Sequence, residues 1–479
     1  MYRRMIANLI CFAAFASTSV AQPDTLWTRH LGTSGQDLGW DVIVNKMGYL
    51  ILGFSDIHGQ YNWDFYLVQT NNAGDTLWTR TYGEPGYDVG YALTAAGDET
   101  YVLAGVTSPA YTYDIYLVKV AANGFPIWTR IIDMTDSDWA YSISPTTDGG
   151  FILAGTSYLP DSSDQALLLK VNALGQMEWY RRFGGVNSET GWHAEQTSDG
   201  GYILAGESTW DEFGSHGSVY VVKTTSSGSP EWIGHYGGPR SEDGHHILET
   251  ADGGFLVAGR TNSYGNGDWD AYFIKLDSNG DTLWTRTSGG SAWDHCVCMA
   301  KAADGDYVAA GYTYSFGVYG EDVYIVKISP DGDFRWTMTV GQAIQDEAFG
   351  IARTYDNGFI LAGRTYPSDS EIYLVRLASG ETAIYDTLNR IPDDISLLPN
   401  YPNPFNASTR IRYRVDHDGS VRLAIYDIIG NRVEVLCDGV QQAGEHIIAW
   451  NAEKVSSGVY FARLETGAGT KTVKMMILK

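Results

Sequence analysis

Cysteine is scarce in this chain of 479 residues, which contains four. One of them, Cys11, lies in an apolar N-terminal run, which leaves Cys296, Cys298 and Cys437. Such a sparse and odd-numbered set is not a disulfide framework. Cys296 and Cys298 are two residues apart on one expected strand, so we expect them to share a face as buried, inert thiols.

Basic residues are also few, because 32 Lys and Arg stand against 57 Asp and Glu, for a net charge of −25. Binding to phosphates needs a basic face, so this balance excludes nucleic acid and anionic membrane surfaces as partners. It suits the solubility of an exported protein. Beyond the N-terminal run, no apolar stretch is long enough to span a bilayer.

Common catalytic motifs are missing as well. The sequence holds no G-x-S-x-G, H-E-x-x-H or G-x-x-x-x-G-K-[ST] pattern. Helical periodicity is also absent, and Gly is frequent, with 55 copies. Many short strands joined by tight turns fit this composition, so we expect an all-β protein.

The N-terminus has the pattern of a secretory signal peptide over residues 1–21. Arg3 and Arg4 precede the apolar run Met5–Ala16. The small residues Ser19–Ala21 then form an A-x-A-like site, which predicts cleavage between Ala21 and Gln22.

The body of the chain is a repeat. A Trp in phrases related to Leu-Trp-Thr-Arg recurs at intervals of 50 to 53 residues. Its positions are Trp27, Trp78, Trp128, Trp179, Trp232, Trp284 and Trp336. A period of this length indicates a repeat architecture.

Each repeat predicts four strands, which in the first are Asp37–Val44, Tyr49–Phe54, Asp64–Thr70 and Thr76–Thr81. The second and third are nearly continuous apolar runs, so both of their faces must be covered. Four-stranded sheets stacked around an axis meet this need, which predicts a β-propeller. A β-helix is the alternative, although its turns are usually about half as long.

The ends of the array predict how the ring closes. It begins with a lone Trp strand, Thr25–His30, and ends with a three-strand set, Asp346–Leu377. If the first strand completes the last blade, no open edge remains. We therefore expect a seven-bladed propeller over residues 22–377. Its repeated sequence pattern resembles the propeller-like repeats of exported bacterial proteins, a resemblance that concerns the fold alone.

The innermost strand of each repeat carries an acid three residues before an aromatic position. These acids are Asp37, Asp88, Asp138, Glu189, Glu242, Asp294 and Asp346, of which Asp294 is displaced by one residue. Such a ring at one mouth of the channel could bind a divalent cation. The alternative is that each acid caps a turn or accepts backbone donors in its own blade.

Three histidines offer a second, weaker metal hypothesis. His193 and His246 hold equivalent positions in neighbouring blades, with His295 nearby. A metal site needs ligands that converge and a supporting second layer. No other cofactor is expected. The repeated Trp and Tyr residues could stack on sugars, but their strict repetition favours blade packing.

The wording changes after Leu377, and we expect a linker over residues 378–396. Alternating strands are then predicted at Arg410–Val415, Val421–Asp427, Glu445–Trp450 and Gly458–Glu465, followed by a basic, apolar end. Several short strands in about eighty residues suggest a small β-sandwich.

Residues 397–479 closely resemble the type A sorting domain of the type IX secretion system. The matching pieces are Asn400–Asn406, Arg422–Val433, Ala443–Trp450, Ser457–Leu464 and Lys474–Lys479. Their key positions are Asn400, Pro402, Asn403, Pro404, Phe405, Asn406, Gly458, Tyr460, Lys474 and Lys479. The resemblance implies an Ig-like fold, export through the periplasm, and the type IX machinery as partner. The alternative is an Ig-like accessory domain.

Two classes of function remain open. A secreted or cell-surface, non-enzymatic binding protein, with a glycan or protein ligand, fits the regular ring and the missing catalytic motifs. A carbohydrate-active hydrolase or lyase would need paired carboxylates at the acidic mouth. The repeat length varies only from 50 to 53 residues, so no large insertion breaks the array, which favours binding.

Overall fold

The computed structural model describes residues 22–379, 395–397 and 405–478, with short gaps at 34, 57–61, 85, 109–111, 135–136, 160–162, 186, 210–215, 318–319, 342–344, 367–369, 416–418, 429, 443, 453 and 467–468. The predicted signal peptide with Ala21, most of the predicted linker, Asn400, Pro402, Asn403, Pro404 and Lys479 lie outside these residues. Every regular element that is described is a β-strand. Within the described part, no helix is long and apolar enough to cross a membrane.

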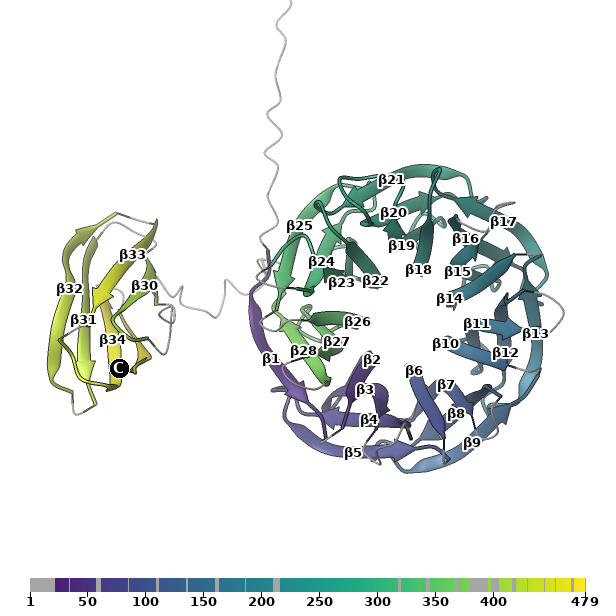
Figure 1. Ribbon diagram of the computed structural model, residues 1–479, viewed down its shortest axis with the longest axis horizontal. Coiled ribbons are helices and arrows are strands. Elements are labelled where there is room, and N and C mark those ends of the chain that lie inside the picture. Colours follow the sequence, from purple (N-terminus) through teal and green to yellow (C-terminus); the bar gives the residue numbers. More distant parts are fainter. Residues whose placement is uncertain are drawn as a thin grey trace, which may run out of the picture. The chain divides into compact units, whose positions relative to one another are not determined.

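The chain divides into two compact units, Met1–Thr382 and Ala383–Lys479, called here the ring unit and the tail unit. The ring unit holds seven four-stranded antiparallel sheets in its described residues. Figure 1 shows these sheets arranged around a central axis, each with one strand nearest the axis. They resemble the blades of a propeller.

Strands at equivalent places form four sets. The inner strands are β2 (Asp37–Asn45), β6 (Tyr87–Ala95), β10 (Ser137–Pro145), β14 (Ser188–Gln196), β18 (Glu242–Glu249), β22 (Asp294–Lys301) and β26 (Asp346–Arg353). The second strands are β3 (Gly48–Ser55), β7 (Tyr101–Ser108), β11 (Phe151–Tyr158), β15 (Tyr202–Thr209), β19 (Phe255–Thr261), β23 (Tyr307–Thr313) and β27 (Phe359–Thr365). The third strands are β4 (Asp64–Thr70), β8 (Asp114–Val120), β12 (Gln165–Val171), β16 (Gly217–Thr224), β20 (Asp270–Leu276), β24 (Asp322–Ile328) and β28 (Glu371–Leu377). The outer strands are β1 (Thr25–Leu31), β5 (Thr76–Tyr82), β9 (Pro126–Ile132), β13 (Met177–Phe183), β17 (Pro230–Tyr236), β21 (Thr282–Ser288) and β25 (Phe334–Val340).

The sheet that joins the two ends of the array combines β1 with β26, β27 and β28. β1 pairs antiparallel with β28, and Arg29 lies opposite Leu374. The backbone N–H of Ala378 also donates to the carbonyl of Asp24, at 2.9 Å. The first strand therefore covers an edge that β28 would otherwise expose.

The middle strands of each sheet supply the core. All residues of β3 and β4 are buried, which explains their continuous apolar sequences. Clusters of buried side chains join neighbouring sheets, as where Leu52 and Phe65 pack with Leu103. Burial on both faces requires a sheet on each side, and the ring provides it.

The repeated Trp of the outer strands packs against the next sheet. A Cβ added to Gly124 would lie 2.7 Å from the ring of Trp78, and Gly124 has a φ of +78°. Only glycine fits this turn, because both its positive φ and the ring forbid a side chain. The same contact joins Trp27 to Gly74, Trp128 to Gly175, Trp179 to Gly228, Trp232 to Gly280 and Trp284 to Gly332. These Trp residues are packing residues, as their repetition predicted.

The expectation that Cys296 and Cys298 share a face is wrong. A β-bulge at Val297 breaks the pairing of β22 with β23, so Cys296 lies opposite Gly311 and Cys298 opposite Ala310. Partners that are adjacent in sequence point to opposite faces. The two buried thiols accordingly enter different core clusters.

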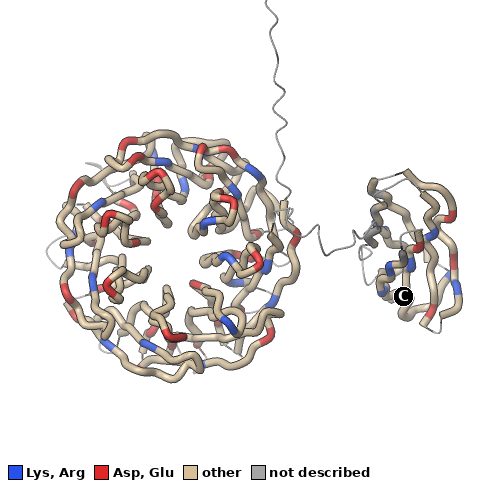
Figure 2. The backbone as a smooth tube through the Cα atoms, turned by 180° about the vertical axis from the view of Figure 1, so that it is seen from behind, with Lys and Arg blue, Asp and Glu red and all other residues tan. Residues whose placement is uncertain are grey.

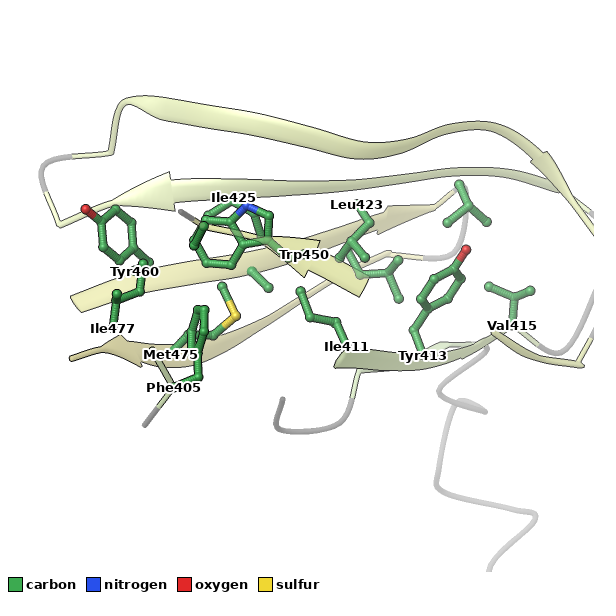
Figure 3. Close-up of a cluster of buried hydrophobic side chains, with 14 residues drawn as sticks. Phe405, Ile411, Tyr413, Val415, Leu423, Ile425, Trp450, Tyr460, Met475 and Ile477 are labelled. Carbon is green, nitrogen blue, oxygen red and sulfur yellow. The ribbon is translucent and has the colours of Figure 1, made fainter. Parts of the chain in front are cut away.

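The tail unit has two antiparallel sheets. One contains β29 (Ile395–Leu397), β30 (Ser408–Val415) and β33 (Gly444–Asn451). The other contains β32 (Arg432–Gln441), β31 (Gly419–Asp427), β34 (Gly458–Thr466) and β35 (Gly469–Ile477). Figure 3 shows buried side chains of both sheets, among them Ile411 and Leu423, around the fully buried Trp450. Strand β32 was not predicted, because it is a largely exposed edge strand with no continuous apolar face.

Candidate binding pocket of the ring

One residue of each inner strand forms a belt around the axis of the ring. Each is the extra residue of a β-bulge, as Trp40 is between Gly39 and Asp41 in β2. A bulge re-aims the side chain it carries, and here the same bulge recurs in all seven inner strands. The belt consists of Trp40, Tyr91, Tyr141, Trp192, His245, Val297 and Phe349.

Six of the seven belt residues have rings, and each ring contacts the next. Centroid distances are 4.5 Å for Phe349–Trp40, 5.4 Å for Trp40–Tyr91, 5.2 Å for Tyr91–Tyr141, 4.6 Å for Tyr141–Trp192 and 5.3 Å for Trp192–His245. These are favourable spacings for tilted and edge-to-face pairs. Val297 is the single break in the belt, between His245 and Phe349.

A pocket of about 360 Å³ lies on the side of the belt at which the inner strands begin, called here the mouth. The belt and three further residues, Arg260, His295 and Tyr312, line it. A second cavity of about 280 Å³ lies beyond the belt, where Asp41, His193 and Cys298 contribute to its wall. The mouth pocket is at the lower end of the range that encloses a small ligand.

The mouth differs from one side of the ring to the other, although the fold repeats. The difference lies in the residue after each inner-strand acid and its partner on the second strand. These pairs are Leu38–Phe54, Val89–Val106, Trp139–Thr156, Thr190–Glu207, Asp243–Arg260, His295–Tyr312 and Glu347–Arg364. The first three sheets give a mainly apolar wall, and the other four, from Thr190–Glu207 onward, give a polar one. In Figure 2, acidic and basic positions are interspersed around the ring.

Arg260 is the charged group of the polar wall that reaches the pocket. Asp243 holds its Nε at 2.6 Å and also lies 3.0 Å from Nε2 of His245. Although burial opposes ionisation, His245 and Arg260 lower the pKa of Asp243 to about 2. The guanidinium also stacks 4.5 Å from the centre of the Trp269 ring. Arg260 is therefore a cation held in place through its Nε, which pairs with Asp243.

His295 stands beside this cation as a neutral ring. Nη1 of Arg260 is 3.4 Å from both of its ring nitrogens. Burial, and then the charge of Arg260, lower the pKa of His295 to about 3. The pocket thus presents neutral imidazole and guanidinium donors close together, facing the aromatic wall.

A second ion pair lies farther round the polar wall. Glu347 accepts bonds from Nε and Nη2 of Arg364 at 2.6 and 2.9 Å. Burial raises the pKa of Glu347 to about 7, with Arg364 opposing the shift and Glu321 adding to it. Neither carboxylate lines the pocket.

Two buried donors of the belt have no acceptor among the described residues. They are Nε1 of Trp40 and Nε1 of Trp192. A buried N–H usually has a partner, so an unpaired one points to a group that comes from outside the chain. Both donors belong to rings that line the mouth pocket and the second cavity alike.

The seven predicted acids lie at the mouth but are buried in their own sheets. Asp138 accepts from Oγ of Ser157 at 2.5 Å, Glu189 from Ser208 at 3.0 Å and Glu242 from Thr261 at 2.8 Å. Each acid faces a Ser or Thr at the end of the second strand, and none lines the pocket. This supports an anchoring role, while cation binding stays a prediction.

The apparent displacement of Asp294 is wrong. It lies opposite Thr313, in the register that the other acids share, three residues before the bulge. The bulge carries Val297 in this repeat, and the absence of an aromatic residue there hid the register in the sequence.

The histidines do not converge as a trio. His193 and His246 stack with centroids 3.8 Å apart, and burial lowers the pKa of His193 to about 4 although the backbone of Ile247 opposes the shift. His295 lies instead at the mouth, beside Arg260. The described residues contain no group of three or more His, Cys, Asp or Glu placed to hold a metal ion.

The belt was overlooked in the sequence. In the sequence, its aromatic positions only marked the place from which each acid was located, three residues earlier. The strict repetition of aromatic residues indicated packing. A comparison of the repeats at the position after each acid would have found the two walls, because it reads Leu, Val, Trp, Thr, Asp, His and Glu.

In the tail unit, Phe405 forms backbone hydrogen bonds with the last strand, β35, and the residue that follows it. Its N–H donates to the carbonyl of Met476 at 3.0 Å, and its carbonyl accepts from Leu478 at 2.9 Å. The ring is buried against Trp450, with centroids 5.5 Å apart. Tyr460 also contacts Trp450, while Asn406 is exposed and Lys474 lies opposite Phe461. Gly458 begins β34.

Residues 400–479 match the family described as the secretion system C-terminal sorting domain. This part of the chain is a type IX sorting domain. The sorting domain marks the chain for export to the cell surface or for secretion, and it implies contact with the type IX machinery.

Comparison with curated proteins found no match. Among solved structures, a fungal alcohol oxidase of the AA5 family in complex with copper is 11% identical, covers 96% of this chain and 100% of its own, and has a TM-score of 0.47. Chaetomium thermophilum Sqt1, bound to the N-terminus of ribosomal protein L10, is 10% identical over 74% of this chain and 100% of its own, with a TM-score of 0.44. PorZ of Porphyromonas gingivalis, a surface component of the type IX secretion system, is 10% identical over 94% of this chain and 100% of its own, with a TM-score of 0.22. These likenesses are weak, and the architecture follows from the chain's own strand pairing.

Proposed function

We propose that the chain is a secreted or cell-surface binding protein without enzymatic activity, which holds a saccharide in the mouth pocket of a seven-bladed β-propeller. In this proposal residues 1–21 are removed as a signal peptide. The sorting domain, an Ig-like β-sandwich, then directs passage across the outer membrane. The observation that carries the proposal is the composition of the pocket wall.

The wall combines five aromatic side chains of the belt with donors and no carboxylate. A sugar ring has apolar faces, which stack on aromatic rings, and hydroxyl edges, which accept hydrogen bonds. Arg260, which lines the pocket, is a suitable donor to those edges. Glycoside hydrolysis usually needs two carboxylates that flank the scissile bond, and this pocket offers neither.

The hydrolase or lyase alternative rests on Glu347 and Glu321. A carboxyl group with a pKa of about 7 can serve as a general acid at neutral pH. Arg364 engages Glu347 through two hydrogen bonds, however, and neither acid borders the pocket. Binding is therefore the better supported function.

The test is a glycan array with the mature full-length chain, followed by calorimetry with the sugars that bind. We expect Trp192→Ala to weaken binding about tenfold, because a stacked aromatic contact is lost. Tyr355→Ala is the matched control, since Tyr355 is 75% exposed and lies in the turn after β26, away from the mouth. Failure of every saccharide to bind, or equal binding by Trp192→Ala, would refute the proposal. Release of new reducing ends by the wild type, lost in Glu347→Gln, would establish the enzyme instead.

A further inference from the structure

We propose that the ligand is an oligosaccharide, with its terminal residue in the mouth pocket and its next residue on an outer aromatic step formed by Trp293 and Tyr314. This inference rests on the proposed function and extends it to a ligand class. The oligosaccharide leaves the pocket on the side of Val297, where the belt has no aromatic ring.

A run of aromatic rings connects the surface to the pocket. Trp293 and Tyr314 are 45% and 43% exposed and pack together with centroids 6.1 Å apart. The Trp293 ring lies 6.1 Å from His295 and nearly parallel to it, at 15°. His295 in turn lies 4.4 Å from Tyr312, and both of these line the pocket.

The step is held in place by backbone structure. The N–H of Tyr314 donates to the carbonyl of Trp293 at 2.7 Å. Trp293 directly precedes the buried acid Asp294, which accepts from the N–H of Gly290 at 2.7 Å and from Oγ of Ser315 at 2.6 Å. The two exposed rings therefore sit on an ordered support, which limits the entropy that a ligand must remove on binding.

In the part of the ring that the structure describes, this step has no equivalent in the other repeats. The residue before the inner-strand acid is Gln36, Tyr87, Ser137, Ser188, Ser241, Trp293 or Gln345. Tyr87 is half-buried in an apolar cluster with Trp63 and Trp139, so its ring contributes to packing. Trp293 alone is a large exposed ring at this position, and its sheet is the one that carries Val297 at the break.

The order of chemical groups along the path suits linked sugars. The aromatic wall of the pocket can stack on a first sugar. Arg260, His295 and Tyr312 then offer polar groups, and the Trp293 ring can stack on the next sugar. Each pyranose ring has apolar faces and a hydroxyl edge, so successive linked sugars can stack on the aromatic rings and bond to the polar groups between them. The pocket of about 360 Å³ encloses only the end of such a chain, so the remainder lies outside, where the step is.

The experiment compares chain lengths by calorimetry on the mature full-length protein. The probes are glucose, xylose and mannose, each with its β-1,4-linked disaccharide and tetrasaccharide. We expect the affinity for the best series to rise at least tenfold from mono- to tetrasaccharide. Trp293→Ala should lower tetrasaccharide affinity at least tenfold more than monosaccharide affinity, and Trp293→Phe should restore part of the gain.

The controls separate this inference from the function on which it rests. Trp192→Ala should weaken all chain lengths, and Tyr355→Ala none. Equal affinity for mono- and tetrasaccharide, or a Trp293→Ala effect that does not depend on length, would overturn the outer step while leaving saccharide binding intact. If no saccharide binds, and a peptide library binds in a way that needs Trp293, both the class of ligand and the proposed function are wrong.

Discussion

The carboxylate at the first or second position of each inner strand shows how one residue can repeat for a local reason. Asp138 accepts from Ser157 of the second strand and from the N–H of Met134, at 2.5 and 3.2 Å. Because the donors come from the neighbouring strand and from the loop just before the acid, the arrangement works in every repeat without contact between acids. The belt residue three positions later repeats for a different reason, since its side chain turns to the axis.

The anchoring role predicts that each acid stabilises its own sheet independently of the other six. Asp138→Ala should lose about 1–3 kcal/mol of unfolding free energy, because buried donors lose their acceptor. Calcium or magnesium should leave the melting temperature of the wild type unchanged. A rise in melting temperature with calcium that disappears in the Asp37→Asn and Asp88→Asn double variant would establish a shared cation site instead.

Asp41 joins two sheets and should make stability depend on pH. Its carboxylate accepts the N–H of Leu93 in the next sheet at 2.9 Å. Burial raises its pKa to about 7, although the N–H groups of Leu93 and Val42 oppose the shift. The folded pKa is above the unfolded value, so the folded state binds more protons between about pH 4 and 7. Its contribution to stability is therefore complete at low pH and is lost as the pH rises to 7.

Asp41→Asn keeps an acceptor for Leu93 but cannot ionise. Urea unfolding at pH 4, 5.5, 7 and 8 should show a smaller loss of stability with rising pH than in the wild type. Asp41→Ala should be less stable than Asp41→Asn at each pH, because the N–H of Leu93 loses its partner. An unchanged pH slope in Asp41→Asn would contradict this assignment.

Among the elements, β1 is the strand that closes the ring of sheets. It completes a sheet whose other strands come from the far end of the array, more than 300 residues later. Trp27 and Leu31 pack against the core between this sheet and the next. Leu26, in contrast, is 53% exposed.

Removal of Gln22–Leu31 should lower the melting temperature and expose the edge of β28. Trp27→Ala should cost about 1.5–3 kcal/mol, the value of a large apolar side chain taken out of a core. Leu26→Ala is the matched control and should stay within about 0.5 kcal/mol of the wild type, since its side chain is mostly in water. Scanning calorimetry of the three variants measures their melting temperatures. We expect the lowest for the truncated chain, then Trp27→Ala, then Leu26→Ala. A truncated chain that melts like the wild type would show that β1 does not stabilise the ring.

At the scale of the whole molecule, the proposed binding pocket and the sorting domain belong to different units. The ring unit has its core clusters, and the tail unit has its own around Trp450. Phe405 joins its segment to the last strand of the tail unit through backbone hydrogen bonds with Met476 and Leu478. A change in one unit should leave the folding of the other intact.

A chain that lacks residues 397–479 should fold its ring but stay in the periplasm of a host with type IX secretion. Fractionation and immunoblotting measure this, with near-ultraviolet circular dichroism as the control for folding. Phe405→Ala should reduce export less sharply, since it loosens the sorting domain without removing it. Normal appearance of the shortened chain outside the cell would contradict the role of the sorting domain in export.

The sequence by itself was enough to predict four-stranded repeats, the pairing of the first strand with the last set, and the sorting domain. Those features depend on local signals: the period of the Trp residues, apolar runs such as Phe151–Gly155, and the motif around Phe405. Only the tertiary structure decided the pocket. Belt residues are about 50 positions apart and meet only because the ring closes, and the bulges that turn them inward are a matter of register between strands. The same bulge separates Cys296 from Cys298, and alternation along a single strand could not reveal it.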